Sequence, residues 1–219
     1  MQCEKYPRST YIEFNWPMAT KIHPTKALLV STTVNLLSTK LPGEIAVDEI
    51  LEASGISKGS LYHHFEDLGE LLEAAQVEIY AAWVDRSVEA LVAMIAKVKT
   101  REDIVNGLKI VTRFTQDKKY SHTRFQRARA IAAAEHNPRF RRRLAEEQTR
   151  LTDALIDLIN EARNKGLYAK DFDAHAGAVL VQAYTLGMIV DDFVENQMDP
   201  EAWYDLIDKV VDKVFLVQG

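Results

Sequence analysis

Apolar residues recur three and four positions apart along most of this 219-residue chain, and this spacing is its most constraining feature. Leu29, Thr33 and Leu37 show it in one segment, and Trp203 and Ile207 show it in another. Such spacing places side chains on one face of an α-helix, whereas a half-buried strand alternates apolar and polar residues. Strand-type alternation is nearly absent, so the sequence predicts an all-α fold of about nine helices.

Composition removes several classes of protein. Hydrophobic residues make up 47% and charged residues 27%, which is the balance of a globular protein rather than a disordered one. No run of 18 apolar residues occurs that could form a membrane-spanning helix, and the N-terminus lacks the apolar core of a signal peptide. The single cysteine, Cys3, excludes an internal disulfide framework and a multi-cysteine zinc site. We expect a cytoplasmic protein without cofactor, metal or membrane partner.

Helix-breaking residues divide the chain into three parts. Residues 1–20 carry scattered aromatic residues without a period and are predicted to form a flexible arm. Residues 21–67 contain three short apolar stripes, separated by Pro42-Gly43 and by Gly55. Residues 68–219 contain longer stripes, and the predicted helices there are 68–97, 101–117, 122–135, 138–165, 172–196 and 200–216.

Within the second part, Val47–Phe65 has the layout of a helix-turn-helix, two short helices joined at Gly55. Its usual use is to lay the second helix in the major groove of DNA, although a plain packed hairpin is the alternative. The side chains expected to face inward are Ile50, Leu51, Ala53, Ile56, Leu61 and Phe65. The residues expected to contact DNA are Lys58, Gly59, Ser60, Tyr62, His63 and His64.

The run LVSTTVNLL…VDEILEASGISKGSLYHHF resembles the TetR family of transcriptional repressors. The match is long and gapless around Gly55, and it covers about a fifth of the chain. HNPRFRRRL (His136–Leu144) is a weaker similarity to the start of a later helix in that family. The resemblance implies a three-helix DNA-binding domain followed by a larger helical domain that dimerises and binds an effector. It also implies a repressor that leaves its operator when a small molecule binds.

The resemblance also assigns roles within the second helix. Tyr62 and His64 correspond to positions that contact DNA phosphates, and Lys58, Ser60 and His63 correspond to positions near base edges. Gly59 is small enough for a close approach to the duplex. Because His64 binds phosphate better when protonated, we expect DNA affinity to weaken as pH rises through the neutral range.

Two departures from the family pattern predict weaker DNA binding. Ala46 stands where the family has a Thr or Ser that caps the helix and touches phosphate, and Leu68 stands where it has Lys. Residues 1–68 also carry eight acidic residues against six basic ones. An alternative function is therefore a helical dimer that has lost tight DNA binding and acts as a ligand- or partner-binding module.

The two C-terminal stripes expose more apolar surface than one neighbouring helix covers. They include Leu180, Met188 and Phe193 in one helix and Leu206 and Val214 in the next. Pairing with the same two helices of a second subunit gives a four-helix bundle, and a homodimer presents two recognition helices to a palindromic operator. A monomer that buries both helices internally is the alternative.

Residues 118–143 contain nine basic residues and one acidic residue. One explanation is local pairing, with Arg142 beside Glu146 and Arg143 beside Glu147. The other is an anionic effector held by Arg124, Arg127 or Arg129. The residues expected to line an effector cavity are Trp83, Phe114, His122, Phe125, Gln126, Arg129, Tyr184 and Met188.

An enzyme is the last alternative. Asp191, Asp192 and Glu195 share one helical face and could hold Mg²⁺. A facing second acidic motif is missing, and no Ser-His-Asp set or phosphate-binding glycine loop is present. No catalytic residue is therefore assigned.

Overall fold

The structure is a computed structural model, and it describes residues 23–216. Two compact units, Met1–Leu68 and Gly69–Gly219, are considered separately below. Within the described residues every regular element is helical, and the only strand-like feature is an antiparallel bridge between Tyr168 and Leu216. The all-α prediction is confirmed. The predicted arm, residues 1–20, lies outside the described residues.

The first unit contains α1 (Pro24–Leu37), a 3-10 turn (Pro42–Glu44), α2 (Val47–Ser54) and α3 (Lys58–His64). Proline suits the first turn of α1 because the missing N–H would have no partner there. Gly55 ends α2 with φ of 68°, a left-handed conformation that favours glycine. The fully buried side chains at the centre of this unit are Leu29, Thr33, Ile50, Leu61 and Phe65.

One residue of this unit that the sequence predicts to face the core, Ala53, does not do so. Ala53 is exposed, whereas Leu51 and Ile56 are half-buried. Helix α2 has only eight residues, and Ile50 is its sole fully enclosed side chain. Ala53 lies three residues after Ile50 near the end of this short helix, and no neighbouring element covers its small side chain.

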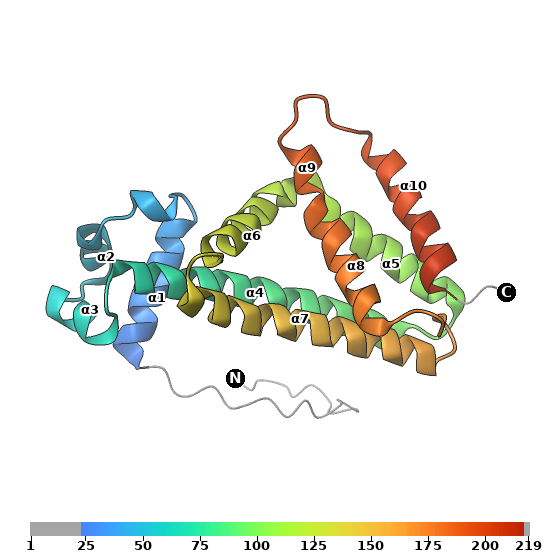
Figure 1. Ribbon diagram of the computed structural model, residues 1–219, viewed down its shortest axis with the longest axis horizontal. Coiled ribbons are helices and arrows are strands. Elements are labelled where there is room, and N and C mark those ends of the chain that lie inside the picture. The colour runs from blue at the N-terminus through green and yellow to red at the C-terminus, as the bar shows by residue number, and fades with distance from the viewer. Residues whose placement is uncertain (1–22, 217–219) are drawn as a thin grey trace, which may run out of the picture. The chain divides into compact units, whose positions relative to one another are not determined.

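The second unit consists mainly of long helices, of which the first, α4, begins at Leu68 (Figure 1). Their bounds are α4 (Leu68–Lys97), α5 (Arg101–Gln116), η2 (Lys118–Tyr120), α6 (Ser121–Ala134), α7 (Pro138–Asn164), α8 (Ala174–Gly187), α9 (Ile189–Asp192), α10 (Pro200–Val210) and a π-helical segment η3 (Val211–Phe215). Side-chain oxygens of Thr100, Asn137 and Asp173 accept hydrogen bonds from the first turns of α5, α7 and α8. These caps satisfy N–H groups that have no partner within the helix.

In this unit α6 and α8 lead away from the two ends of α7, and α9 brings the end of α8 back against α6 (Figure 1). In the view of Figure 1, α6, α7 and α8 form the three sides of a triangle, and α4 runs beside α7. Arg139 of α7 donates to Glu73 of α4 at 2.9 Å, which ties the two helices together. Side chains of these helices meet, because Arg127 of α6 lies over the Trp83 ring of α4. Gln148 of α7 likewise hydrogen-bonds with Gln182 of α8.

The predicted helix over 172–196 is interrupted. Helix α8 ends at Gly187, α9 spans only four residues, and residues 193–199 are not helical. Gly177, near the start of α8, sits so close to Phe172 that a Cβ there would lie 2.8 Å from its ring. A larger residue at that position would push α8 away from its neighbours.

Candidate nucleic-acid interface and effector region

Helix α3 is held by its inner face and leaves its outer face free. Ser57 caps it by accepting a hydrogen bond from the Ser60 N–H at 3.3 Å. Leu61 is fully buried and Phe65 is 2% exposed, which fixes the rotation of the helix. Of the predicted contact residues, Lys58, Gly59, Tyr62 and His63 are exposed, and Ser60 and His64 are half-buried.

Three histidines gather at the C-terminal end of α3. The His64 ring lies 4.7 Å from that of His23 and 5.1 Å from that of His63. Burial, followed by the charges of His23, His63 and Lys26, lowers the pKa of His64 below its ordinary value. His64 is therefore harder to protonate than a free histidine, which moves its expected pH response to lower pH.

The start of α2 shows how the chain manages without a polar cap. Ala46 has the extended backbone of a capping residue but no side-chain acceptor. Glu49 instead accepts a hydrogen bond from the Ala46 N–H at 3.2 Å and pairs with Lys40. These contacts, Lys40 first, lower the pKa of Glu49. One cation of the first unit is thus already paired with an acid of its own surface.

The predicted effector residues fall into two groups. Phe114 is 55% exposed, and its ring contacts Tyr120 on the surface. His122 and Arg129 are also exposed. Half-buried positions are occupied by Trp83, Phe125, Gln126, Tyr184 and Met188.

A line of polar contacts crosses the second unit from α4 to α8. The Tyr80 hydroxyl donates to Gln148 Oε1, and the Gln148 amide donates to Gln182 Oε1. Gln182 in turn donates to Thr152 Oγ1 at 3.2 Å. Apolar periodicity did not predict these contacts, because a polar residue on a buried helix face counts against the stripe.

Tyr184 of α8 also carries a polar group into the interior. Burial raises the pKa of its hydroxyl, although a hydrogen bond with Thr112 of α5 acts in the opposite direction. Thr112 is 4% exposed. The hydroxyl therefore stays protonated at neutral pH and can serve as a donor.

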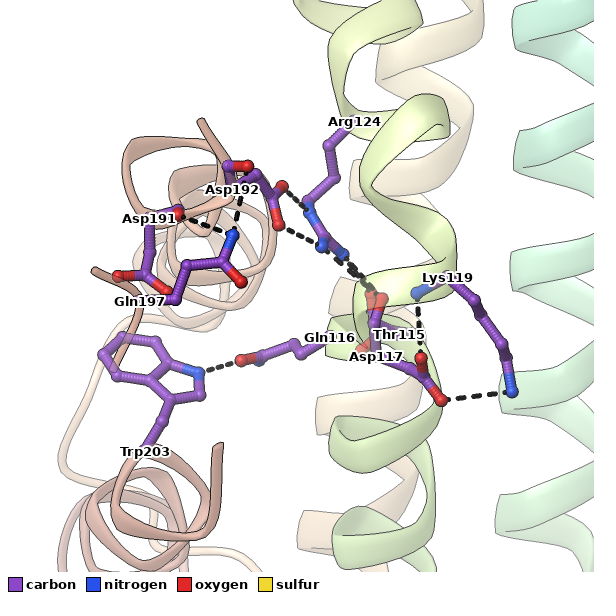
Figure 2. Close-up of polar contacts among 9 residues, drawn as sticks. All are labelled: Thr115, Gln116, Asp117, Lys119, Arg124, Asp191, Asp192, Gln197 and Trp203. Atoms are coloured by element: carbon purple, nitrogen blue, oxygen red, sulfur yellow. Dashed lines mark hydrogen bonds and ion pairs between the residues drawn. The ribbon is translucent and has the colours of Figure 1, made fainter. Parts of the chain in front are cut away.

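Arg124 joins α6 to α9 (Figure 2). Its guanidinium donates to both carboxylate oxygens of Asp192, at 2.5 and 2.7 Å, and to the Thr115 carbonyl at 3.2 Å. The side chains of this pair are 3% and 4% exposed. Because Asp192 is bound to Arg124, it is not available to a metal-binding cluster with Asp191 and Glu195. No metal-binding group of acidic, histidine and cysteine residues occurs within residues 23–216.

Arg124 and Arg139 of the basic segment pair with carboxylates that are distant in the sequence. Arg139 pairs with Glu73, as described above, and Glu147 pairs with Arg150 rather than with Arg143. Arg150 also reaches Asp85 of α4. Among the described residues neither predicted pair, Arg142 with Glu146 or Arg143 with Glu147, is formed, and Glu147 pairs with Arg150 of the next helical turn instead.

An outward-facing recognition helix on a three-helix core, together with a separate helical unit, defines the helix-turn-helix class of regulators. Residues 29–75 match the model of the bacterial regulatory proteins of the tetR family, and residues 127–216 match that of the BetI-type transcriptional repressor C-terminal domain. The two matches together take in more than half of the chain. The chain belongs to the TetR family and is a ligand-responsive DNA-binding transcriptional regulator.

Solved structures share this fold. A TetR-family regulator from Cytophaga hutchinsonii is 15% identical, with a TM-score of 0.66 over 91% of this chain and 100% of that one. FadR from Bacillus subtilis, in complex with stearoyl-CoA, is 12% identical, with a TM-score of 0.57 over 85% and 97%. A regulator from Saccharomonospora viridis, in complex with choline, is 12% identical, with a TM-score of 0.63 over 88% and 98%.

A search of curated protein sequences finds no significant match to this chain. No helix between residues 23 and 216 has both the length and the apolar character that crossing a bilayer requires.

Proposed function

We propose that the protein is a cytoplasmic repressor that binds a palindromic operator in double-stranded DNA as a homodimer. A small molecule that binds the unit Gly69–Gly219 releases it from that operator. The observation that carries the proposal is the outer face of α3, where Lys58, Tyr62 and His63 are exposed while Leu61 fixes the helix from within. Exposed donors on a fixed helix suit base edges and phosphates in the major groove.

Uncovered apolar side chains at the end of the chain support the dimer. Val179 and Leu180 of α8 are 49% and 41% exposed, and Leu206 of α10 is 52% exposed. Phe193, just after α9, is 68% exposed. Large apolar side chains left exposed on these helices favour pairing with a second copy. The dimer in turn provides the second recognition helix that a palindrome requires.

Release from the operator follows because effector binding and operator binding are thermodynamically linked. An effector acts only if it binds one arrangement of the dimer more tightly than the arrangement that fits the operator. Operator and effector then weaken each other's binding by the same factor. The protein needs no chemical step for this response.

The test is DNA binding by the full chain. A labelled duplex from the region upstream of its own gene is titrated at low salt and followed by fluorescence anisotropy. Lys58→Ala is expected to weaken binding at least about tenfold, because it removes a base or phosphate contact. Lys40→Ala is the matched control: it removes the same charge from the same unit, but from a lysine already paired with Glu49.

Equal weakening by both lysine variants would leave only general charge attraction and would contradict a recognition role for α3. Complete absence of binding at low salt would instead favour the second candidate function, a ligand- or partner-binding dimer. The uncapped start of α2 at Ala46 is the observation that favours this second function. It removes a side chain that the family resemblance places on a phosphate.

A further inference from the structure

Two arginines on α6 are buried one helical turn apart, and only one of them is neutralised. Arg124 is 2% exposed and Arg127 is 5% exposed. Arg124 forms a bidentate ion pair with the carboxylate of Asp192 (Figure 2). A buried charge is normally paired in this way, because leaving water is costly for an ion. Arg127 is buried as well but has no such carboxylate partner among the described residues.

The surroundings of Arg127 are aromatic rather than acidic. Its guanidinium carbon lies 3.5 Å from the centre of the Trp83 ring and 5.8 Å from that of Tyr80. No carboxylate within residues 23–216 forms an ion pair with it, its guanidinium hydrogen-bonds with the Tyr80 hydroxyl, and its Nε has no hydrogen-bond partner there. Ring faces attract a cation, but they do not accept the in-plane N–H bonds of a guanidinium.

Electrostatics agree with that geometry. Burial lowers the pKa of Arg127, and the neighbouring charge of Arg124 acts in the same direction, although the Tyr80 hydroxyl opposes them. An arginine remains charged in proteins even so. The interior of this unit therefore contains a positive charge that its own acidic residues leave unpaired.

Neutral polar groups continue from this charge into the unit. Tyr80 touches Arg127 and also donates to Gln148, which donates to Gln182 of α8. These groups can donate to or accept from a ligand after small side-chain rotations, and none of them is negative. Arg127, Trp83 and this polar line come from four different helices that meet inside the unit.

We propose that Arg127 anchors the effector by binding its acidic group, a carboxylate or a phosphate, and that the effector is an organic anion with an apolar body. The inference rests on the proposed function, because it names the ligand class of the same response. A guanidinium suits either acidic group, since its N–H donors match two oxygens at once. Trp83 and the adjacent core then cover the apolar part of the ligand.

The experiment uses pairs of probes that differ only in charge. Octanoate is compared with octanamide and phenylacetate with phenylacetamide. Phenyl phosphate tests the phosphate arm, and choline serves as a cation. Binding to the full chain is measured by calorimetry and by the shift in melting temperature. At least one acid is expected to bind and stabilise the protein, while its amide and choline do not.

Arg127→Met is expected to lower the affinity for that acid at least tenfold. Arg129→Met is the matched control, because Arg129 is an exposed arginine on the same helix. Arg127→Lys keeps the charge but loses the paired donors, so it should retain weak binding even if the methionine variant does not fold. A preference for phenyl phosphate over both carboxylates would identify the acidic group as a phosphate.

The proposal is overturned if no acid binds, if an amide binds as well as its acid, or if Arg127→Met binds the acid as tightly as Arg129→Met does. These outcomes are separate from the DNA titration. Binding of an acid through Arg127 without any binding to DNA would refute the repressor and leave the anion site. Binding to DNA with no role for Arg127 in acid binding would support the repressor and refute the anion site.

Discussion

The two units of this protein use their charged side chains in opposite ways. In the first unit, Lys58 and His63 stand on the outer face of α3, where they contribute little to the fold. In the second unit, Arg124 and Asp192 are withdrawn from water and hold α9 against α6. Exposed charges can be changed at little cost to stability, whereas buried pairs cannot. Substitution of the exposed side chains on α3 should therefore affect DNA binding, and substitution of the buried Arg124–Asp192 pair should affect folding.

The largest expected effect is on stability. Asp192→Asn leaves the Arg124 guanidinium buried without its counter-ion, which typically costs about 3–5 kcal/mol of unfolding free energy. Urea unfolding followed by circular dichroism measures the loss. The double variant Arg124→Met with Asp192→Leu should recover most of it, because neither charge remains. A single variant as stable as the wild type would mean that water reaches this pair.

Arg127 sharpens the comparison within one helix. Arg127→Met removes a buried charge that has no carboxylate partner, so the ligand-free protein should be as stable as the wild type or more stable, by up to about 2 kcal/mol. The same urea experiment measures it. A loss as large as that of Asp192→Asn would show that Arg127 supports the fold in the way Arg124 does.

The next effect is on DNA binding alone. Tyr62 is 44% exposed and should contribute to the operator complex but not to the core. Tyr62→Ala is expected to cost about 1–3 kcal/mol in operator binding and to change the unfolding free energy by less than about 0.5 kcal/mol. Anisotropy titration and urea unfolding on the same sample separate the two quantities. A large loss of stability would place Tyr62 with the structural residues.

A smaller expected effect is a gain in stability from a helix cap at position 46. Ala46 already has an extended backbone, with φ of −93° and ψ of 153°, so Ala46→Ser should place a hydroxyl beside the free N–H groups of α2. Such a cap is worth about 1 kcal/mol. The melting temperature should rise, and DNA binding should strengthen if the hydroxyl also meets a phosphate. An unchanged melting temperature would mean that Glu49 already satisfies this helix start.

The sequence predicted the first unit more fully than the second. Glycine, the capping serine and the spacing of Leu61 and Phe65 are local signals, and they were enough to orient α3. The pair of Arg124 with Asp192 joins residues 68 positions apart, and no local pattern indicates it. The phase of α6 did contain a signal that was missed. Arg124, Arg127, Ala130 and Ala134 share one buried face, which separates Arg127 from the exposed Arg129.

The smallest effect concerns pH and belongs to the first unit. The pKa of His64 lies below its ordinary value of 6.5, mainly because of burial, so His64 is largely neutral in the free protein at pH 7. Operator affinity should therefore be nearly constant between about pH 7 and 8 and should rise as pH falls below about 6.5. The folded state binds this proton less readily than the unfolded chain does, so the same pH decrease should slightly lower stability.

His64→Gln tests whether the proton on His64 causes the expected pH dependence of operator affinity. The glutamine keeps a donor for phosphate but does not titrate, so its operator affinity should rise less between about pH 7 and 5.5 than that of the wild type. Anisotropy titrations at matched ionic strength measure the difference. His63→Gln is the control, because His63 is the exposed neighbour on the same helix. An affinity that already changes between pH 7 and 8 in the wild type, but not in His64→Gln, would mean that DNA raises the pKa of His64 enough to offset its burial.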